Sequence, residues 1–116
     1  MKKLNKIMLI LSLLPTLLTS VFIFFMNDTV PMHYNASGAV DRYGSKYENF
    51  IFPAIILFMY AFYMVYTKIY TKYSTNSIEK INNNVKITAI LVTSIIAAFN
   101  ILQLMFLILA ILKPDS

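Results

Sequence analysis

The hydrophobic and polar positions along this chain fall in long blocks rather than alternating residue by residue. Three apolar runs cover residues 7–26, 50–70 and 87–112, and Lys68 is the only charged residue in them. A helix of about 20 residues is roughly 30 Å long, which matches the hydrocarbon thickness of a bilayer. The pattern therefore predicts an all-α integral membrane protein with three transmembrane helices, folded as one domain over residues 1–116.

The first run follows three lysines and resembles a cleavable signal peptide in that respect. Signal peptides have an apolar region of about 7–15 residues that ends in small residues. This run is longer and ends in Phe24, Phe25 and Met26, which favours an uncleaved membrane anchor. Pro15 and Pro53 fall inside the first two predicted helices, where each removes a backbone donor, so we expect bends there.

Two polar segments separate the apolar runs. Residues 71–86 are predicted to form a loop rich in lysine, serine and asparagine, whereas residues 27–49 hold both glycines, the only histidine and the only arginine of the chain. Residues 27–49 are longer than a simple connection between two helices usually is, so we expect an ordered loop on the membrane surface. Asn35–Gly38 is typical of a turn. Ser45 with Glu48 is a capping-box pattern that predicts the start of the second helix.

The third run carries small and polar residues on one side. At about 100° per residue, five of them fall within roughly a third of the helix circumference. They are Ala89, Thr93, Ala97, Asn100 and Gln103. Small residues let helices approach closely, and buried amides hydrogen-bond across them. We interpret this set as an intramolecular packing seam, with a homodimer contact and a ligand groove as open alternatives.

The composition agrees with a membrane protein. Only 13% of the residues are charged, against about 25% in a typical soluble domain, so lipid must replace water over much of the surface. The net charge is +5, and the basic residues sit in the polar segments beside the apolar runs, where they suit anionic lipid headgroups. No basic stripe with stacking aromatic residues occurs there, which argues against nucleic-acid binding. The absence of cysteine excludes disulfides and thiolate chemistry.

Lysine and arginine are distributed unevenly between the two sides of the predicted membrane. Seven fall in the N-terminal segment and between Lys68 and Lys86, in and just before the second polar segment, whereas three fall in the first polar segment and at the C-terminus, namely Arg42, Lys46 and Lys113. The side richer in these residues is usually cytoplasmic. We therefore expect a cytoplasmic N-terminus, with the first loop and the C-terminus outside the cell.

The polar residues of the first loop do not form a known catalytic pattern. His33 with Asp28, Asp41 and Glu48 is a weak ligand set, because one histidine and scattered carboxylates lack the usual metal-site spacing. No nucleophile motif or paired acid and base accompanies the histidine. We predict no metal, no cofactor and no enzymatic activity, and a purely structural or headgroup-anchoring role for these residues stays open.

The first loop also carries the most specific pattern of the chain. Its members are Pro31, His33, Tyr34, Asn35, Gly38, Asp41, Arg42, Tyr43, Gly44, Ser45 and Lys46. In this order and spacing they resemble the N-terminal domain of the SdpI family, membrane immunity proteins against the secreted SDP killing toxin of bacilli. The resemblance covers roughly residues 4–70. Full-length members carry a further multi-span region, and the short stand-alone members resemble this chain better.

The resemblance implies a multi-pass protein of the bacterial plasma membrane that protects against a secreted peptide toxin. The first hypothesis is that the loop residues named above bind or sequester an amphipathic toxin at the outer face, with an apolar groove between helices taking its apolar side. The second hypothesis is a structural or regulatory subunit that binds a larger transporter or sensor through the seam of the third helix. The expected partners are the lipid bilayer and a peptide toxin, or else a second copy or a larger membrane protein.

Overall fold

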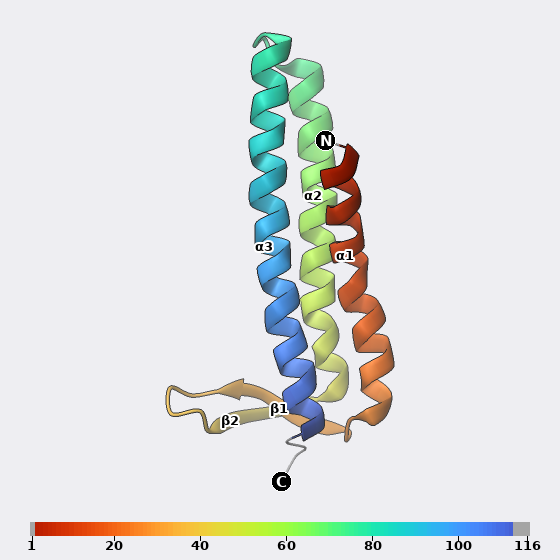
Figure 1. The fold of residues 1–116 in the computed structure, drawn as a ribbon. Coiled ribbons are helices and arrows are strands. Elements are labelled where there is room, and N and C mark those ends of the chain that lie inside the picture. Colours follow the sequence, from red (N-terminus) through yellow and green to blue (C-terminus); the bar gives the residue numbers. More distant parts are fainter. Residues whose placement is uncertain (1, 113–116) are drawn as a thin grey trace.

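The computed structural model describes residues 2–112. Three long helices run side by side, and a two-stranded hairpin lies across one end of them (Figure 1). In chain order the elements are α1 (Lys2–Phe22), the 3₁₀ turn η1 (Ile23–Phe25), β1 (Thr29–Tyr34), β2 (Val40–Ser45), the 3₁₀ helix η2 (Lys46–Phe50), α2 (Ile51–Tyr73) and α3 (Ile78–Leu112). We call the end that carries the strands the hairpin end, and the opposite end, where α2 joins α3, the lysine end.

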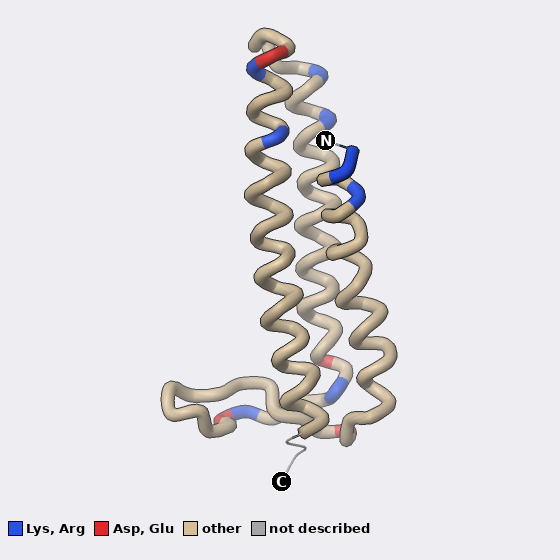
Figure 2. Tube along the Cα trace, viewed as in Figure 1, with Lys and Arg blue, Asp and Glu red and all other residues tan. Residues whose placement is uncertain are grey.

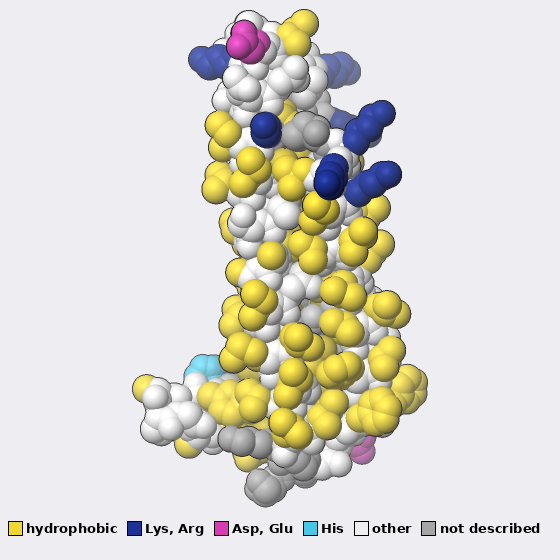
Figure 3. Space-filling view, viewed as in Figure 1, with side chains coloured by type: hydrophobic (Ala, Val, Ile, Leu, Met, Phe, Trp, Pro, Cys, Tyr) yellow, Lys and Arg dark blue, Asp and Glu magenta, His cyan; other side chains and the backbone are white. Residues whose placement is uncertain are grey.

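The outside of the bundle is apolar between its two ends. All three helices are long and apolar enough to cross a membrane. Large side chains such as Leu17 and Phe58 point outward, with 63% and 71% of their surface exposed. Hydrophobic side chains cover much of the visible face, and lysines gather near one end (Figures 2 and 3). Helices that are apolar on their exposed side face lipid. The prediction of three spans is confirmed, and the chain is a multi-pass membrane protein.

Two clusters of buried side chains join the elements. The first lies in the body of the bundle and consists of Met8, Ile56, Tyr63, Ala89 and Ile96. The second lies at the hairpin end and consists of Met26, Val30, Leu107 and Ala110. In lipid, close packing and hydrogen bonds hold helices together, because surrounding acyl chains are as apolar as the side chains. Close packing of side chains in the second cluster therefore holds the hairpin against α3.

The connection between α2 and α3 is shorter than the sequence indicates. Most of the segment expected to be a loop, residues 71–86, is helical, and only residues 74–77 join the two helices. The Ser77 hydroxyl accepts a hydrogen bond from the backbone amide three residues later at 3.3 Å, as an N-cap serine does. Asn84, inside the expected loop, donates to the Tyr70 hydroxyl at 2.7 Å. An asparagine that is typical of loops is accommodated in α3 because α2 supplies its partner.

Pro15 lies in the middle of α1 and leaves one carbonyl of that helix without its usual donor. Proline has no N–H, so the Leu11 carbonyl four residues earlier receives no hydrogen bond from the α1 backbone. The Asn100 side chain of α3 donates to this carbonyl at 2.9 Å and to the Ile96 carbonyl of its own helix at 2.9 Å. An unpaired carbonyl in hydrocarbon is costly, so Asn100 joins α3 to α1 where α1 lacks a bond.

Gln103 continues this connection one turn further along α3. Its side-chain amide donates to the Pro15 carbonyl at 3.1 Å and to the Thr19 hydroxyl, and the residue is only 1% exposed. Both partners lie at defined heights on α1. Asn100 and Gln103 together therefore define how far α3 is shifted and rotated against α1.

The remaining residues of the predicted seam are small. Ala89 is fully buried, and Thr93 and Ala97 are half-buried. The Thr93 hydroxyl is buried and has no hydrogen-bond partner among residues 2–112. The structure thus places the seam against the chain's own helices.

Pro53 lies in the first turn of α2, where proline is tolerated. The preceding segment, Lys46–Phe50, is a 3₁₀ helix, and α2 begins at Ile51. The sequence predicts a bend inside a continuous helix at Pro53. The structure instead changes from a 3₁₀ helix to an α-helix just before the proline.

Replacing Asn100 by leucine is expected to destabilise the bundle by about 1–2 kcal/mol, because the Leu11 carbonyl is then unpaired in lipid. In a Pro15→Ala background the same substitution should cost less, because an alanine at position 15 supplies the missing N–H. Unfolding in mixed detergent micelles measures both effects. Ser94→Ala is the control, since its hydroxyl bonds only within α3, and should leave stability unchanged. An equal cost of Asn100→Leu in both backgrounds would contradict this account of Pro15.

Candidate functional site

The loop between α1 and α2 is a β-hairpin. β1 and β2 pair antiparallel, with Thr29 opposite Ser45 at the base, and the register shifts on either side of His33. Its turn reaches out beyond the helices (Figure 1). The prediction of an ordered loop between the first two spans is confirmed. Its strands are not evident in the sequence, because Pro31 and the irregular pairing break the alternation that marks a strand.

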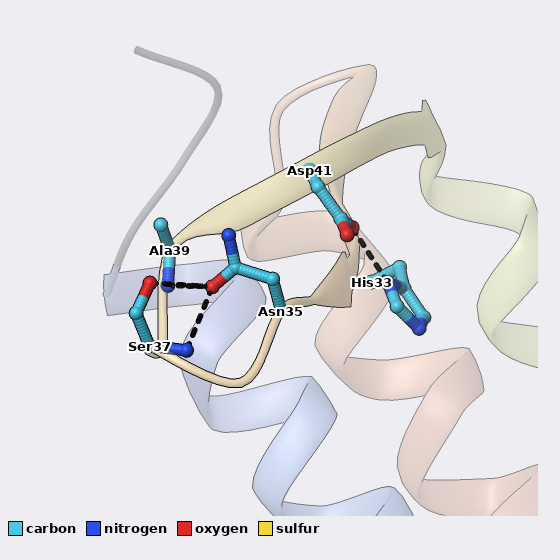
Figure 4. A network of polar contacts seen from close by, with 5 residues as sticks. All are labelled: His33, Asn35, Ser37, Ala39 and Asp41. Atoms are coloured by element: carbon cyan, nitrogen blue, oxygen red, sulfur yellow. Dashed lines mark hydrogen bonds and ion pairs between the residues drawn. The ribbon is translucent and has the colours of Figure 1, made fainter.

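One side chain holds the turn of the hairpin. Asn35 Oδ1 accepts hydrogen bonds from the Ser37 amide at 3.0 Å, the Ser37 hydroxyl at 2.7 Å and the Ala39 amide at 3.0 Å (Figure 4). The backbone of Gly38 has φ +83°, a left-handed conformation that costs other residues roughly 1–2 kcal/mol. The turn predicted over Asn35–Gly38 is confirmed, and its asparagine and glycine have distinct physical roles.

The base of the hairpin is tied to the bundle. Val30 is fully buried in the cluster that includes Leu107 of α3. The Lys46 amide donates to the Asp28 carbonyl at 2.9 Å, which closes the loop on itself. Further out, the Tyr34 ring lies 6.1 Å from the ring of a phenylalanine on α3, centre to centre. The hairpin is therefore anchored at its base, while its turn residues are exposed.

Three ion pairs lie on the hairpin and its base. His33 Nδ1 is 2.6 Å from Asp41 Oδ1. The other two pairs join Arg42 to Glu48 at 3.3 Å and Lys46 to Asp28 at 3.6 Å. Exposed pairs of this kind contribute little to stability. The polar groups of the first two pairs lie at the surface and are thus available to exchange partners at low cost, which a binding surface requires, whereas the Lys46 side chain is only 17% exposed.

The His33 side chain lies on the side of the hairpin that faces the helices. Figure 4 shows the imidazole projecting from β1 toward the bundle, with Asp41 reaching it from β2. Figure 3 shows the histidine on the same side of the overhanging hairpin. Because the helices cross the membrane, this side of the hairpin looks toward the lipid surface. His33 and Asp41, eight residues apart in the sequence, therefore form one polar site under the overhang.

Tyr34, the residue after His33, packs against Phe106 of α3. Its hydroxyl is buried and has no hydrogen-bond partner in the part of the chain that the structure describes. Burial raises the pKa of the Tyr34 phenol above its ordinary value of 10.0, and the nearby Tyr43 phenol adds to this rise. The Tyr34 hydroxyl therefore stays protonated at physiological pH.

Gly44 leaves room for the Glu48 side chain at the hairpin base. A Cβ atom at this position would lie 1.7 Å from Glu48 Oε2 and 3.0 Å from Met32 Cγ. Any larger residue would push the Glu48 carboxylate away from Arg42. Next to it, the Ser45 hydroxyl accepts a bond from the Tyr47 amide at 3.2 Å and caps η2, so the helical segment begins directly after Ser45, as the sequence predicts.

The structure brings most of the loop residues named by the sequence into one hairpin and places the seam of α3 elsewhere. No group of three or more His, Asp or Glu residues suited to a metal occurs within residues 2–112. Two contributors are not evident in the sequence. Phe106 supports the hairpin from inside an apolar run, and buried Asn49 donates to the Lys46 carbonyl at 2.9 Å. The sequence offers a hint only for Asn49, which is a polar residue directly before an apolar run.

A family model described as a domain of unknown function (DUF1648) matches residues 10–57. The match covers the end of α1, the whole hairpin and the start of α2. This family is commonly associated with membrane proteins, in agreement with the three spans. No curated protein and no solved structure matches the chain.

Replacing Asn35 by alanine is expected to loosen the turn without unfolding the bundle. Three hydrogen bonds to Oδ1 are lost, so the Ser37 and Ala39 amides should exchange their hydrogens about tenfold faster or more. Hydrogen exchange followed by mass spectrometry measures this. The Lys46 amide, bonded at the hairpin base, is the internal control. Faster exchange at Lys46 as well would mean that the turn and base unfold together, contrary to this prediction.

Proposed function

We propose that this chain protects a bacterial plasma membrane by binding a secreted amphipathic peptide toxin at the hairpin before the toxin inserts. The position of His33 and Asp41 carries the proposal, because they lie under an overhang that faces the lipid surface (Figures 3 and 4). An amphipathic peptide lies in the plane of the membrane interface, with its apolar side toward the acyl chains. In the interface beneath the hairpin, the polar side of such a peptide would meet His33 and Asp41.

The contacts follow from the bonds that each residue already makes. His33 uses Nδ1 for Asp41, so its other ring nitrogen is the atom that meets a ligand. Arg42 exchanges Glu48 for a carboxylate of the peptide, since an exposed pair costs little to separate. The Tyr43 ring is 41% exposed and offers apolar contact. Lys46 has a side chain only 17% exposed and pairs with Asp28, so it supports the hairpin base.

The anchored base makes the hairpin a preformed surface. Binding to a surface that is already ordered avoids part of the entropy cost of association. Val30 in its buried cluster and the capped turn at Asn35 order the two ends of β1. This favours a binding role over that of a passive connection.

The subunit hypothesis has less support from the structure. Its proposed contact was the seam of α3, but Asn100 and Gln103 donate to α1 of the same chain. Ala89 is fully buried. Residues engaged inside the bundle are not available to hold a larger transporter or sensor.

The proposal places the hairpin outside the cell and the lysine end in the cytoplasm, following the positive-inside rule. Lys113, which the sequence count assigned to the outer side, lies outside the described residues. Since the chain has no cysteine, single cysteines report topology directly. Ser37→Cys at the turn should react with a membrane-impermeant maleimide in intact cells, whereas Glu79→Cys at the lysine end should react only after lysis. The opposite result would reverse the topology and remove the proposed site from the toxin's path.

Expression in a strain sensitive to an SDP-type peptide toxin tests the function. The chain should raise the toxin concentration needed for killing, and His33→Ala or Asp41→Asn should reduce that gain by about tenfold, because a charge-assisted contact is lost. Asn76→Ala, at the opposite end of the bundle, is the matched control and should protect fully. Membrane levels of each variant are compared by immunoblot. Unchanged killing by wild type at normal membrane levels would refute the proposal.

A further inference from the structure

A hollow lies between α2 and α3, and a second hollow follows it along α2 toward the lysine end; we call the two together the groove. Its apolar part is a hollow of about 450 Å³, lined by Phe58, Phe62 and Tyr66 of α2 and by Thr88 and Val92 of α3. The two phenylalanines are 71% and 65% exposed, so their rings lie on the outer surface of the bundle. The groove thus opens to the lipid phase.

The floor of this hollow is fixed. Tyr63, which also lines it, is only 2% exposed. Its hydroxyl donates to Asn5 Oδ1 of α1 at 3.2 Å. The hollow is therefore a formed feature of the bundle and not a gap that a rotamer change of Tyr63 would close.

Toward the lysine end the groove gains hydroxyl groups, although most of its lining is still apolar. A second hollow of about 410 Å³ is lined by Tyr66, Ile69, Tyr70, Tyr73, Ser74 and Thr75. Because Tyr66 lines both hollows, the two adjoin. Phe58 to Tyr66 spans about 12 Å along a helix, close to the roughly 15 Å of one leaflet's hydrocarbon. The groove therefore gains hydroxyl groups over the depth of one leaflet.

The hydroxyl-bearing part of the groove lies in a strongly positive region. The Lys72 ammonium lies 5.2 Å from the ring centre of Tyr73, which lines the second hollow. The lysine end carries seven lysines, from Lys2, Lys3 and Lys6 to Lys68, Lys72, Lys80 and Lys86, and its only described carboxylate is Glu79 (Figure 2). A ligand with a negative headgroup is favoured there.

We propose that this groove is a binding site for one anionic phospholipid. An acyl chain lies in the apolar hollow against Phe62 and Val92, and the phosphate lies by Lys72 and the hydroxyls of Tyr73 and Ser74. A transmembrane helix of a partner would be apolar across both leaflets and would leave the hydroxyl-bearing part without a match. The site is separate from the hairpin and does not depend on toxin protection.

Native mass spectrometry of the purified full chain tests the site. The probes are phosphatidylglycerol and phosphatidylcholine with identical acyl chains, added to the protein in detergent. We expect wild type to retain one lipid molecule and to prefer phosphatidylglycerol. Val92→Trp fills the hollow and should lower retention about tenfold or more. Ile101→Trp, on an exposed position of the same helix that lines neither hollow, is the control and should bind as wild type.

A second pair of variants tests the headgroup contact without changing the packing. Lys72→Gln should lower the preference for phosphatidylglycerol about fivefold, as one lysine near an anionic headgroup is worth about 1 kcal/mol. Lys86→Gln removes the same charge from α3 and should change the preference less, because it is Lys72 that lies over Tyr73, a residue that lines the second hollow. Circular dichroism verifies that each variant is folded.

Three results of these binding measurements would overturn the proposal. They are equal retention of the two lipids by wild type, equal loss in Val92→Trp and Ile101→Trp, and equal effects of Lys72→Gln and Lys86→Gln. A lipid-free dimer that Val92→Trp dissociates would also overturn it and would assign the groove to a second copy. Failure of toxin protection with lipid binding intact would affect only the proposed function.

Discussion

The missing hydrogen-bond donor at Pro15 and the two amides that compensate for it determine how this bundle is assembled. In lipid no water is present to satisfy the Leu11 carbonyl, so a partner must come from the protein. Asn100 provides it, and Gln103 adds bonds to the Pro15 carbonyl and Thr19 one turn away. Apolar side chains alone would allow α3 to slide along α1 at little cost. The amides remove this freedom, because their partners lie at fixed heights.

The position of the hairpin depends on that arrangement. The last turns of α3 provide Leu107 and Ala110, which bury Val30, and Phe106, against which Tyr34 packs. All three lie within seven residues of Gln103 on the same helix. A shift of α3 would move this support and with it the orientation of the strands. The exposed polar site under the hairpin is therefore linked to a hydrogen-bonding arrangement buried within the membrane.

The sequence predicts different parts of this architecture with different success. The spans follow from the long uncharged runs, and the turn at Asn35–Gly38 follows from residue types with one preferred conformation. The early start of α3 at Ile78 is not evident from the sequence because the first turns of this helix are largely polar, and the partner of Asn84 there is Tyr70 of α2. The pairing of His33 with Asp41 is hidden because it requires two strands whose alternation is broken by Pro31 and by bulges.

By itself, the sequence determined the features that depend on local composition and on the spacing of hydrophobic and polar residues. This includes three spans, a polar ordered segment between the first two, a turn with an asparagine and a glycine, and a helix side bearing amides. Only the tertiary structure decided which groups those amides satisfy, that the polar segment is a hairpin that projects beyond the helices, and that α2 and α3 leave a hollow between them. The physical reason is that the first set depends on neighbours a few residues away. The second set depends on contacts between residues as far apart as Leu11 and Asn100, which form only when the helices are packed.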